Sequence, residues 1–278
     1  MKPYFIFTPD WSKYSAGVVV LHTLAHRLKL MGLPVYLNTP IQNPQWGRLP
    51  VITEFAGDKN KVIAVYPEIV NGNPYQCKTV VRYLLHLPGF FGGPTFFDNG
   101  DLLFIHSNLF NQRVGLPEER VLFFPYLDTN IFYDMKIERS LKFYFKRKEN
   151  GTYPDPRIAE VQSIGTGREN ESEDAQKNLA ARLNQTKVLY CYDNVTAMVD
   201  IARLCGCAVV MIPDEFWTEQ ECRHFGGWEA GGIAYGIERE FEAVDSVSSE
   251  AMRKYYTVDA EAQAKIAMLK FIEITQKG

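Results

Sequence analysis

"KVLYCYDNVTAMVDIARLCGCAVVMIPD" (residues 187–214) decides the fold class of this chain. Two apolar runs, residues 188–191 and 208–212, flank a segment whose apolar residues recur at helical spacing. Continuous apolar runs of this length are typical of parallel strands that are buried on both faces. The stretch therefore predicts a strand, a helix and a second strand, which is the unit of a parallel α/β sheet.

The first residues of the chain repeat this pattern. "YFIFTP" (residues 4–9) and "PVYLNT" (residues 34–39) are predicted as strands, and "AGVVVLHTLAHRLKLMG" (residues 16–32) as the helix that joins them. Gly32 matches the glycine that ends many helices. Further apolar runs are "KVIAVYPEIV", "DLLFIHSN" and "RVLFFPYLD", read as strands, and "TVVRYLLHLPG", read as a strand or a short helix. We expect an α/β protein with two Rossmann-like lobes and parallel sheets, the second lobe being short.

The composition changes after "FFPYLDTNIFYD" (residues 123–134), because residues 147–178 are mostly polar and charged. We place the domain boundary there. Residues 1–134 are expected to form an N-terminal acceptor-side lobe, and residues 135–278 a C-terminal lobe for a nucleotide-sugar. The helical pattern of residues 259–277 is assigned to the second lobe.

Composition and charge exclude several classes of protein. The formal net charge of −3 gives no basis for nucleic-acid binding, which depends on basic patches. No window approaches the ~18 uninterrupted apolar residues of a membrane span. The five cysteines lie singly or in apolar surroundings, and the N-terminus lacks the features of a signal peptide. We therefore expect a cytoplasmic protein, and aromatic loops such as "GFFGG" permit peripheral contact with the inner face of the membrane.

Candidate site residues in the first lobe follow its predicted strands, since ligands of parallel sheets gather at the carboxyl ends of the strands. Ser15, Ala16 and Gly17 are small residues at the start of the first helix, where a ligand could approach the backbone. Glu68 follows a strand and could act as a base or hold a sugar hydroxyl. The alternatives are an ordinary helix start and a solvated loop glutamate. The aromatic loop of residues 88–93 could stack on a sugar ring or plug the core.

The second lobe offers cations and a helix N-terminus. Lys146 and Arg147 belong to a basic cluster that could offset the charge of a phosphate leaving group, and a solvated strand end is the alternative. Asp193 and Asn194 could cap the helix of the opening stretch.

Two further polar residues lie within that helix. Thr196 lies in its first turn, where backbone and hydroxyl donors can bind phosphate. Asp200 lies one turn further on the same face, where a carboxylate could accept hydrogen bonds from a ribose diol.

Four segments together resemble the GT-B glycosyltransferases, and among them enzymes that build bacterial cell-surface polysaccharides. The segments are "SAG…LHTLAHRLKLMGLPVYLNT", "VYPEIVNGNPYQCKTVVRYLLHLPGFFGG", "FFPYLDTNIFYD" and "YDNVTAMVDIARLCGCAVVMIPD". The last resembles the donor-nucleotide unit of this family, in which a glutamate at the position of Asp200 holds the ribose. Retaining members carry a second glutamate, and Tyr192 stands at its position here. No Asp-x-Asp metal motif is found, so neither a metal nor a cofactor is expected.

The resemblance implies transfer of a sugar from a nucleotide-sugar to a glycan or lipid-linked saccharide acceptor in polysaccharide biosynthesis. The donor is expected to lie between the lobes. Glu68 would be the base of an inverting reaction, whereas leaving-group stabilisation by Lys146 and Arg147 would carry more of a retaining one. Two alternatives stay open: a sugar-nucleotide epimerase, and a non-catalytic sugar-nucleotide-binding protein of the same fold.

Overall fold

The computed structural model describes residues 1–54, 57–146, 155–165 and 174–278. The chain forms two compact units, each of which is described by itself. Unit 1 consists of Met1–Tyr126 together with Ala260–Gly278, and unit 2 consists of Leu127–Asp259. Among the described residues, no helix has the length and apolar character needed to cross a membrane.

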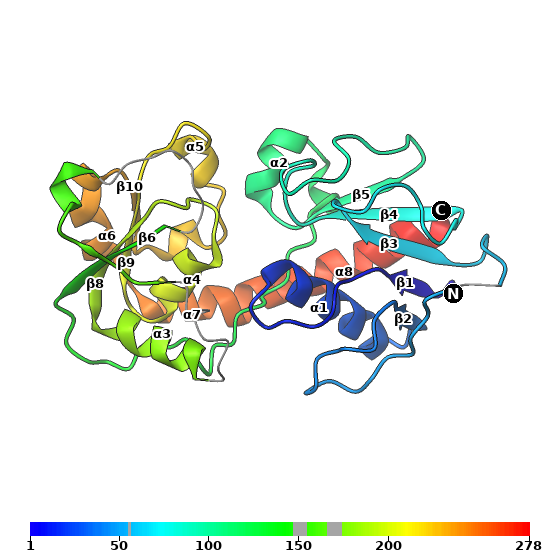
Figure 1. The fold of residues 1–278 in the computed structure, drawn as a ribbon, viewed down its shortest axis with the longest axis horizontal. Coiled ribbons are helices and arrows are strands. Elements are labelled where there is room, and N and C mark those ends of the chain that lie inside the picture. Colours follow the sequence, from blue (N-terminus) through cyan, green and yellow to red (C-terminus); the bar gives the residue numbers. More distant parts are fainter. Residues whose placement is uncertain (55–56, 147–154, 166–173) are drawn as a thin grey trace. The chain divides into compact units, whose positions relative to one another are not determined.

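Unit 1 contains a five-stranded parallel sheet in the order β2-β1-β3-β4-β5 (Figure 1). Its strands are β1 (Tyr4–Ile6), β2 (Val35–Leu37), β3 (Ile63–Pro67), β4 (Thr79–Leu84) and β5 (Leu102–Ile105). All residues of β3 and β4 are buried, as their uninterrupted apolar sequences predict.

The helices of unit 1 cover one face of this sheet. Helices α1 (Ala16–Leu30) and α8 (Ala260–Lys277) share one core cluster with strand residues such as Tyr4 and Ile6. The opposite face, with Phe5 and Tyr66, is covered by loop residues such as Tyr75 and Val70. A short helix, α2 (Asn108–Val114), follows β5.

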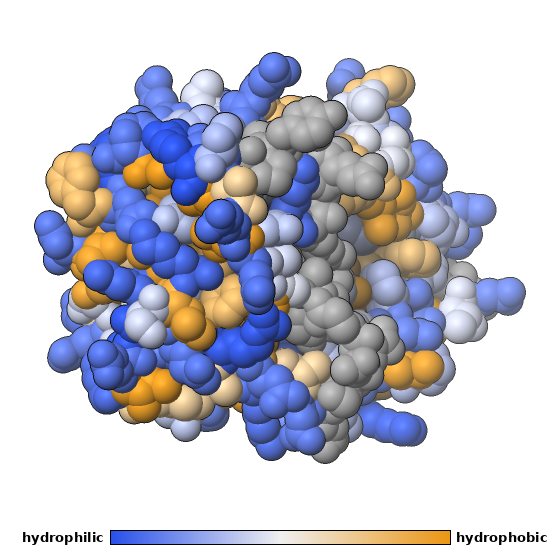
Figure 2. All heavy atoms as spheres, turned by 60° about the vertical axis from the view of Figure 1, so that its left-hand side comes forward, coloured by the Kyte–Doolittle hydropathy of each residue, from blue (hydrophilic) through white to orange (hydrophobic). Residues whose placement is uncertain are grey.

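Unit 2 contains a second five-stranded parallel sheet, in the order β10-β9-β8-β6-β7. Its strands are β6 (Leu141–Phe145), β7 (Gln162–Ser163), β8 (Thr186–Cys191), β9 (Ala208–Met211) and β10 (Ile233–Tyr235). Its α-helices are α3 (Ala175–Gln185), α4 (Ala197–Leu204), α5 (Glu219–Cys222), α6 (Glu240–Ser246) and α7 (Ser249–Lys254). On the face that Figure 2 turns forward, hydrophobic residues lie in small groups among hydrophilic ones.

The expected fold class is confirmed, because both units are α/β with parallel sheets. Both sheets also have the same connectivity when the strands are numbered along each unit, with the first strand lying between the second and the third. Among the residues that the structure describes, the second lobe, which we expected to be short, has as many strands as the first. "RVLFFPYLD" forms no strand and contributes only an isolated bridge from Val121 to Ile105.

The domain boundaries differ from the expected ones at both points where the chain passes from one unit to the other. Helix α8, expected in the second lobe, packs on unit 1, where Phe271 stacks on Tyr4 with ring centroids 5.8 Å apart. Its Gln276 side chain accepts a 2.8 Å hydrogen bond from the backbone N–H of Lys2. The two ends of the chain therefore lie together in unit 1 (Figure 1).

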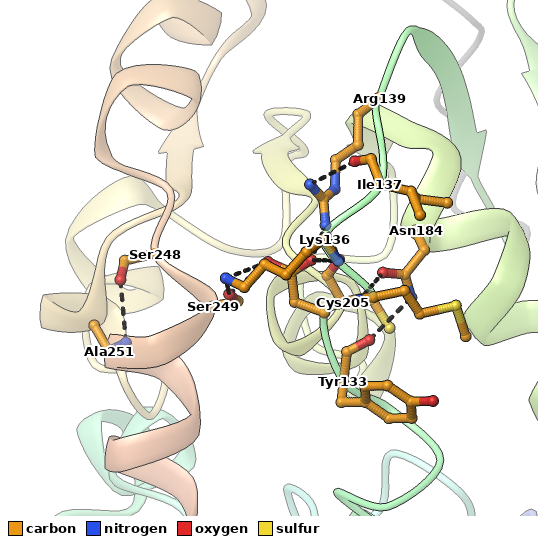
Figure 3. A network of polar contacts seen from close by, with 11 residues as sticks. Tyr133, Lys136, Ile137, Arg139, Asn184, Cys205, Ser248, Ser249 and Ala251 are labelled. Carbon is orange, nitrogen blue, oxygen red and sulfur yellow. Dashed lines mark hydrogen bonds and ion pairs between the residues drawn. The ribbon is translucent and has the colours of Figure 1, made fainter.

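Residues 127–134, expected in the first lobe, belong to unit 2 because a polar network holds them there (Figure 3). The Asp134 carboxylate accepts hydrogen bonds from Arg139, from the backbone of Lys136 at 2.8 Å and from the hydroxyl of Ser249 at 2.7 Å. The buried Asn184 side chain donates to the carbonyl of Tyr133 at 2.9 Å. The boundary consequently lies at residues 126–127.

Candidate functional site

The topology of each sheet indicates where a ligand would bind. In an open parallel sheet, ligands bind beyond the carboxyl ends of the strands, at the point where the strand order reverses. In unit 1 this point lies at β1 and β3, and in unit 2 it lies at β6 and β8. Glu68 comes directly after β3, Lys146 directly after β6, and residues 192–196 directly after β8. Sequence reasoning therefore selected residues at both topological switch points.

Glu68 is a buried carboxylate at the carboxyl edge of unit 1, with 4% of its surface exposed. Pro67 pairs with Tyr83 in the parallel register of β3 and β4, so that Glu68 lies next to the residues that follow β4. Its Oε2 atom accepts a 2.8 Å hydrogen bond from the backbone N–H of Leu85. Glu68 is therefore fixed by the sheet and is not the solvated loop glutamate of the alternative interpretation.

Burial raises the pKa of Glu68 to about 6, although hydrogen bonding from the backbone of Leu85 and His86 acts to lower it. Near neutral pH this group therefore passes readily between its charged and neutral forms. A carboxyl group with such a pKa can accept a proton from a hydroxyl and release it afterwards.

An aromatic cluster begins at His86, directly after Leu85, whose backbone N–H binds this carboxylate. The ring of His86 stacks on Phe90 with centroids 4.0 Å apart, and it also contacts Phe91 at 4.9 Å and Phe110 at 4.5 Å. Phe91 is 60% exposed and Phe90 39% exposed. Two partly exposed rings in the loop whose Leu85 N–H binds the buried carboxylate can stack on the apolar face of a sugar, whereas the plug interpretation would require them to be buried.

The residues Ser15, Ala16 and Gly17 lie at the start of α1. Ser15 occupies the N-cap position, and its side chain makes no capping hydrogen bond. A Cβ atom on Gly17 would lie 3.3 Å from Cδ1 of Leu85, the residue that holds Glu68. The structure thus brings Gly17 and Leu85 together, and close packing against Leu85 accounts for the glycine. Ligand binding at these three residues stays a prediction.

In unit 2, Asn194 is the most enclosed polar residue of the β8–α4 connection, with 1% of its surface exposed. Its Nδ2 atom donates to the carbonyl of Ile212 and to the Asp214 carboxylate, both at 3.1 Å. Its Oδ1 atom is buried and has no hydrogen-bond partner among the described residues. An acceptor in this position can take a hydroxyl or N–H group of a ligand, because buried polar atoms are seldom left without a partner.

The N-terminus of α4 is capped by Thr196, in contrast to the expected capping by Asp193 and Asn194. The hydroxyl of Thr196 accepts from the backbone N–H of Met198 at 3.4 Å. Asp193 is buried, and its carbonyl accepts from the thiol of Cys191 at 3.1 Å. The cap therefore falls later than expected, and Asp193 belongs to the turn that leads into the helix.

Of the two predicted cations, Lys146 lies at the carboxyl end of β6, with its Nζ atom 5.9 Å from the ring centroid of Tyr192. Arg147 lies outside the described residues. The other lysine on this strand, Lys142, is bound to Glu240 at 2.7 Å. Charge stabilisation by Lys146 stays a prediction.

Asp200, predicted to hold a ribose, lies inside unit 2 with 4% of its surface exposed. Its Oδ1 atom lies 3.6 Å from the guanidinium of Arg203, which is 1% exposed. Arg203 also donates to the carbonyls of Gly227 and Gly231. Oδ1 of Asp200, like that of Asn194, is buried without a hydrogen-bond partner among the described residues. The charge of Arg203 compensates that of Asp200, so its burial needs no ligand, and ribose binding by Asp200 stays a prediction.

Sequence reasoning missed two residues that shape these edges. Asp214 binds Asn194 and also accepts from the backbone of Phe216 and Trp217, so it holds the turn after β9. Arg82 is a buried cation in β4. The available signal was a single charge within the apolar run "TVVRYLL". No group of three His, Cys, Asp or Glu side chains among the described residues could hold a metal ion.

No family model matches this sequence. A search of curated proteins also found no match.

Solved structures with a similar chain trace include two glycosyltransferases. The first is AviGT4, involved in avilamycin A biosynthesis, with a TM-score of 0.45 and 12% identity over 100% of this chain and 98% of that one. The second is SnogD from Streptomyces nogalater, with a TM-score of 0.43 and 13% identity over the whole of both chains. An uncharacterised protein from Klebsiella pneumoniae has a TM-score of 0.46 and 12% identity over 84% of this chain and 92% of that one.

Proposed function

We propose that this protein is a glycosyltransferase that moves a sugar from a nucleotide-sugar to a hydroxyl group of a glycan or lipid-linked saccharide. The observation that carries the proposal is the position of Glu68, a buried carboxyl group at the topological switch point of unit 1 with a pKa of about 6. A group of this kind suits a general base that works near neutral pH.

In the proposed reaction Glu68 takes the proton of the acceptor hydroxyl while the hydroxyl oxygen attacks the anomeric carbon of the donor sugar. The bond from that carbon to the diphosphate oxygen breaks, and the nucleoside diphosphate leaves with the bonding electrons. The exposed rings of Phe90 and Phe91 would orient the acceptor sugar. This sequence of events inverts the configuration at the anomeric carbon.

We assign the donor nucleotide to the carboxyl edge of unit 2. Free N–H groups at the N-terminus of α4, with the hydroxyl of Thr196, suit a diphosphate. Lys146 would offset the charge of the leaving group. The Oδ1 atom of Asn194 suits a ribose or base donor after a small movement, because it is now buried. This assignment replaces the expected contact with Asp200.

Binding of the donor is tested by thermal unfolding in the presence of UDP, GDP, ADP, dTDP or CMP and their sugar conjugates. A ligand at about 100 times its Kd stabilises the folded state by ~2.7 kcal/mol. We expect at least one of these nucleotides to raise Tm, and Thr196→Val to reduce the rise. Ser248→Ala removes the N-cap hydroxyl of α7 and is the matched control, for which the rise should be unchanged. If none of these ligands raises Tm, the donor site is disproved.

Turnover then separates the alternatives. Sugar transfer to an acceptor should be lowered by about 10²–10⁴-fold in Glu68→Gln, because a glutamine cannot accept the proton. Conversion of the bound nucleotide-sugar without an acceptor would identify an epimerase. Binding without conversion of any donor would identify a non-catalytic sugar-nucleotide-binding protein.

A further inference from the structure

Arg82 lies in β4, and only 2% of its surface is exposed. A buried guanidinium is costly unless its N–H groups find acceptors. Nε of Arg82 donates to Oδ2 of Asp101 at 2.6 Å. The two terminal nitrogens donate to the carbonyls of Val70 at 3.0 Å and Gly72 at 2.6 Å. This single side chain therefore contacts two loops that are far apart in the sequence.

Both loops are crossovers that connect parallel strands without a helix. Residues 68–78 join β3 to β4 and residues 85–101 join β4 to β5; all of them are described, and none is helical. Parallel strands are usually joined through a helix, which satisfies its own backbone groups. Crossovers without a helix need other hydrogen-bond partners, because buried carbonyl groups are rarely left unpaired. Arg82 supplies such partners to the first crossover and an ion pair to the second.

Aromatic rings complete the enclosure of the guanidinium. Its central carbon lies 5.2 Å from the ring centroid of Tyr66 in β3 and 5.3 Å from that of Phe97 in the second crossover. Contacts of this kind are attractive, because the face of an aromatic ring is electronegative. Arg82 thus contacts Tyr66 of the neighbouring strand β3 and Phe97 of the second crossover.

The two crossovers carry the catalytic features of the proposed site. Glu68 begins the first crossover, and the carbonyls that Arg82 holds belong to the turn that follows it. Phe90 and Phe91 lie in the second crossover. The crossovers also contact each other, because a Cβ atom on Gly93 would lie only 2.7 Å from Cα of Ile69.

We propose that Arg82 is a positioning residue, which fixes both crossovers and thereby places the Glu68 carboxylate and the Phe90–Phe91 rings for the acceptor. The inference rests on the proposed function for its catalytic meaning. The positioning itself can be measured without a substrate. Lysine cannot replace Arg82 in this role, because an ammonium group is a compact point charge and cannot form the planar fork of three separate contacts.

The test uses the full chain and its Arg82→Lys variant. The first measurement is the titration of the Glu68 side-chain carbon by ¹³C NMR, with the signal assigned from Glu68→Gln. We expect a midpoint of about 6 in the wild type and a lower one, towards the ordinary 4.5, in Arg82→Lys, because released crossovers admit water to the carboxylate. The second measurement is amide hydrogen exchange. We expect exchange in residues 69–73 and 90–101 to be roughly tenfold faster in the variant.

Arg120→Lys is the matched control, because Arg120 also contacts a carbonyl, that of Leu103, and an aromatic ring, that of Phe104. It touches neither crossover, so both measurements should match the wild type. If Arg82→Lys does not fold, Asp101→Asn, which removes the ion pair alone, is measured in the same way. A folded variant in which only one of the two quantities changes, or neither, overturns the inference. Since no nucleotide or acceptor is used, a failed nucleotide screen does not affect the result.

Discussion

Asp200 and Arg203 form an ion pair inside unit 2, with carboxylate and guanidinium atoms 3.6 Å apart and neither side chain more than 6% exposed. Burial raises the pKa of Asp200 to about 7, although the charge of Arg203 acts to lower it. The pair interacts with Tyr255. Burial raises the pKa of Tyr255, and its hydroxyl forms a hydrogen bond with the backbone of Gly227.

The raised pKa of Asp200 makes the stability of the protein depend on pH. The folded state favours the protonated carboxyl, so this contribution to stability is complete below the unfolded pKa of about 3.8 and is lost as pH rises through about 7. Asp200→Asn has no such titration. We therefore expect the free energy of unfolding of the variant to rise by ~1 kcal/mol or more relative to the wild type from pH 4 to pH 8. Urea unfolding at several pH values measures this difference, and a constant difference would contradict the prediction.

Glu68→Gln should stabilise the protein at high pH although it lowers activity. The pKa of Glu68 is raised from 4.5 to about 6, so its contribution to stability is present below pH 4.5 and is lost as pH rises through 6. Relative to the wild type, the variant should gain up to ~2 kcal/mol between pH 4 and pH 8. Chemical unfolding at these two pH values tests the expectation. If the stability of the variant relative to the wild type did not increase from pH 4 to pH 8, burial of the charged carboxylate would cost no free energy.

Asp134→Asn should destabilise unit 2. Burial alone would raise the pKa of Asp134, but hydrogen bonds from Ser249, Lys136 and Arg139 outweigh it and hold the pKa well below the usual range. Loss of these charge-assisted bonds should cost ~2–4 kcal/mol at pH 7. The difference from the wild type should shrink as pH falls below about 4, where the unfolded carboxyl becomes protonated.

The matched control for this variant is Asp128→Asn, which also lies in residues 127–134. Asp128 accepts a 2.9 Å hydrogen bond from the backbone of Asn130 at an exposed position. Its substitution should cost less than that of Asp134 in the same denaturant titration. Equal costs would mean that the network of Figure 3 does not hold residues 127–134 to unit 2.

Gly93→Ala should disturb the aromatic loop more than Gly92→Ala. Both glycines have positive φ angles, 81° and 85°, which L-residues adopt with strain. A Cβ atom on Gly93 would lie 2.7 Å from the backbone of Ile69, whereas nothing lies within 4 Å of one on Gly92. Both variants should lose ~1 kcal/mol from strain, and Gly93→Ala should lose more. Equal Tm values for the two variants would contradict the close packing of the two crossovers.

Local patterns in the sequence predicted most strands and the two-unit α/β architecture, because a buried parallel strand is a continuous apolar run whatever lies around it. Local patterns do not show which distant residues a segment will contact, and this explains what the sequence did not predict. The helical pattern of residues 259–277 is plain, but its partner depends on a contact of Phe271 with Tyr4 at the other end of the chain. Asp200 shares a helix face with Thr196, but only the buried Arg203 shows that this part of the face is turned inward.

The site was predictable where the topology alone decides it. Glu68 and Lys146 directly follow strands at the points where the strand order reverses, and strand ends are visible in the sequence. The environment of each side chain was not visible, because Glu68 is hydrogen-bonded by Leu85, and Asn194 donates to Ile212 and Asp214, all of them distant in the sequence. The cap at Thr196 depends on where the first helical turn begins, and such boundaries are the least reliable part of a sequence prediction.

Helix α8 completes unit 1 although its residues are synthesised after all of unit 2. During translation, the sheet of unit 1 therefore has an uncovered apolar area until Ala264, Met268 and Phe271 have been synthesised and pack on it. Unit 2 is continuous in sequence and can finish folding earlier. The N-terminal half of the molecule is thus the last to mature, and a ribosome that stalls after residue 259 would leave an incomplete core for chaperones or proteases to recognise.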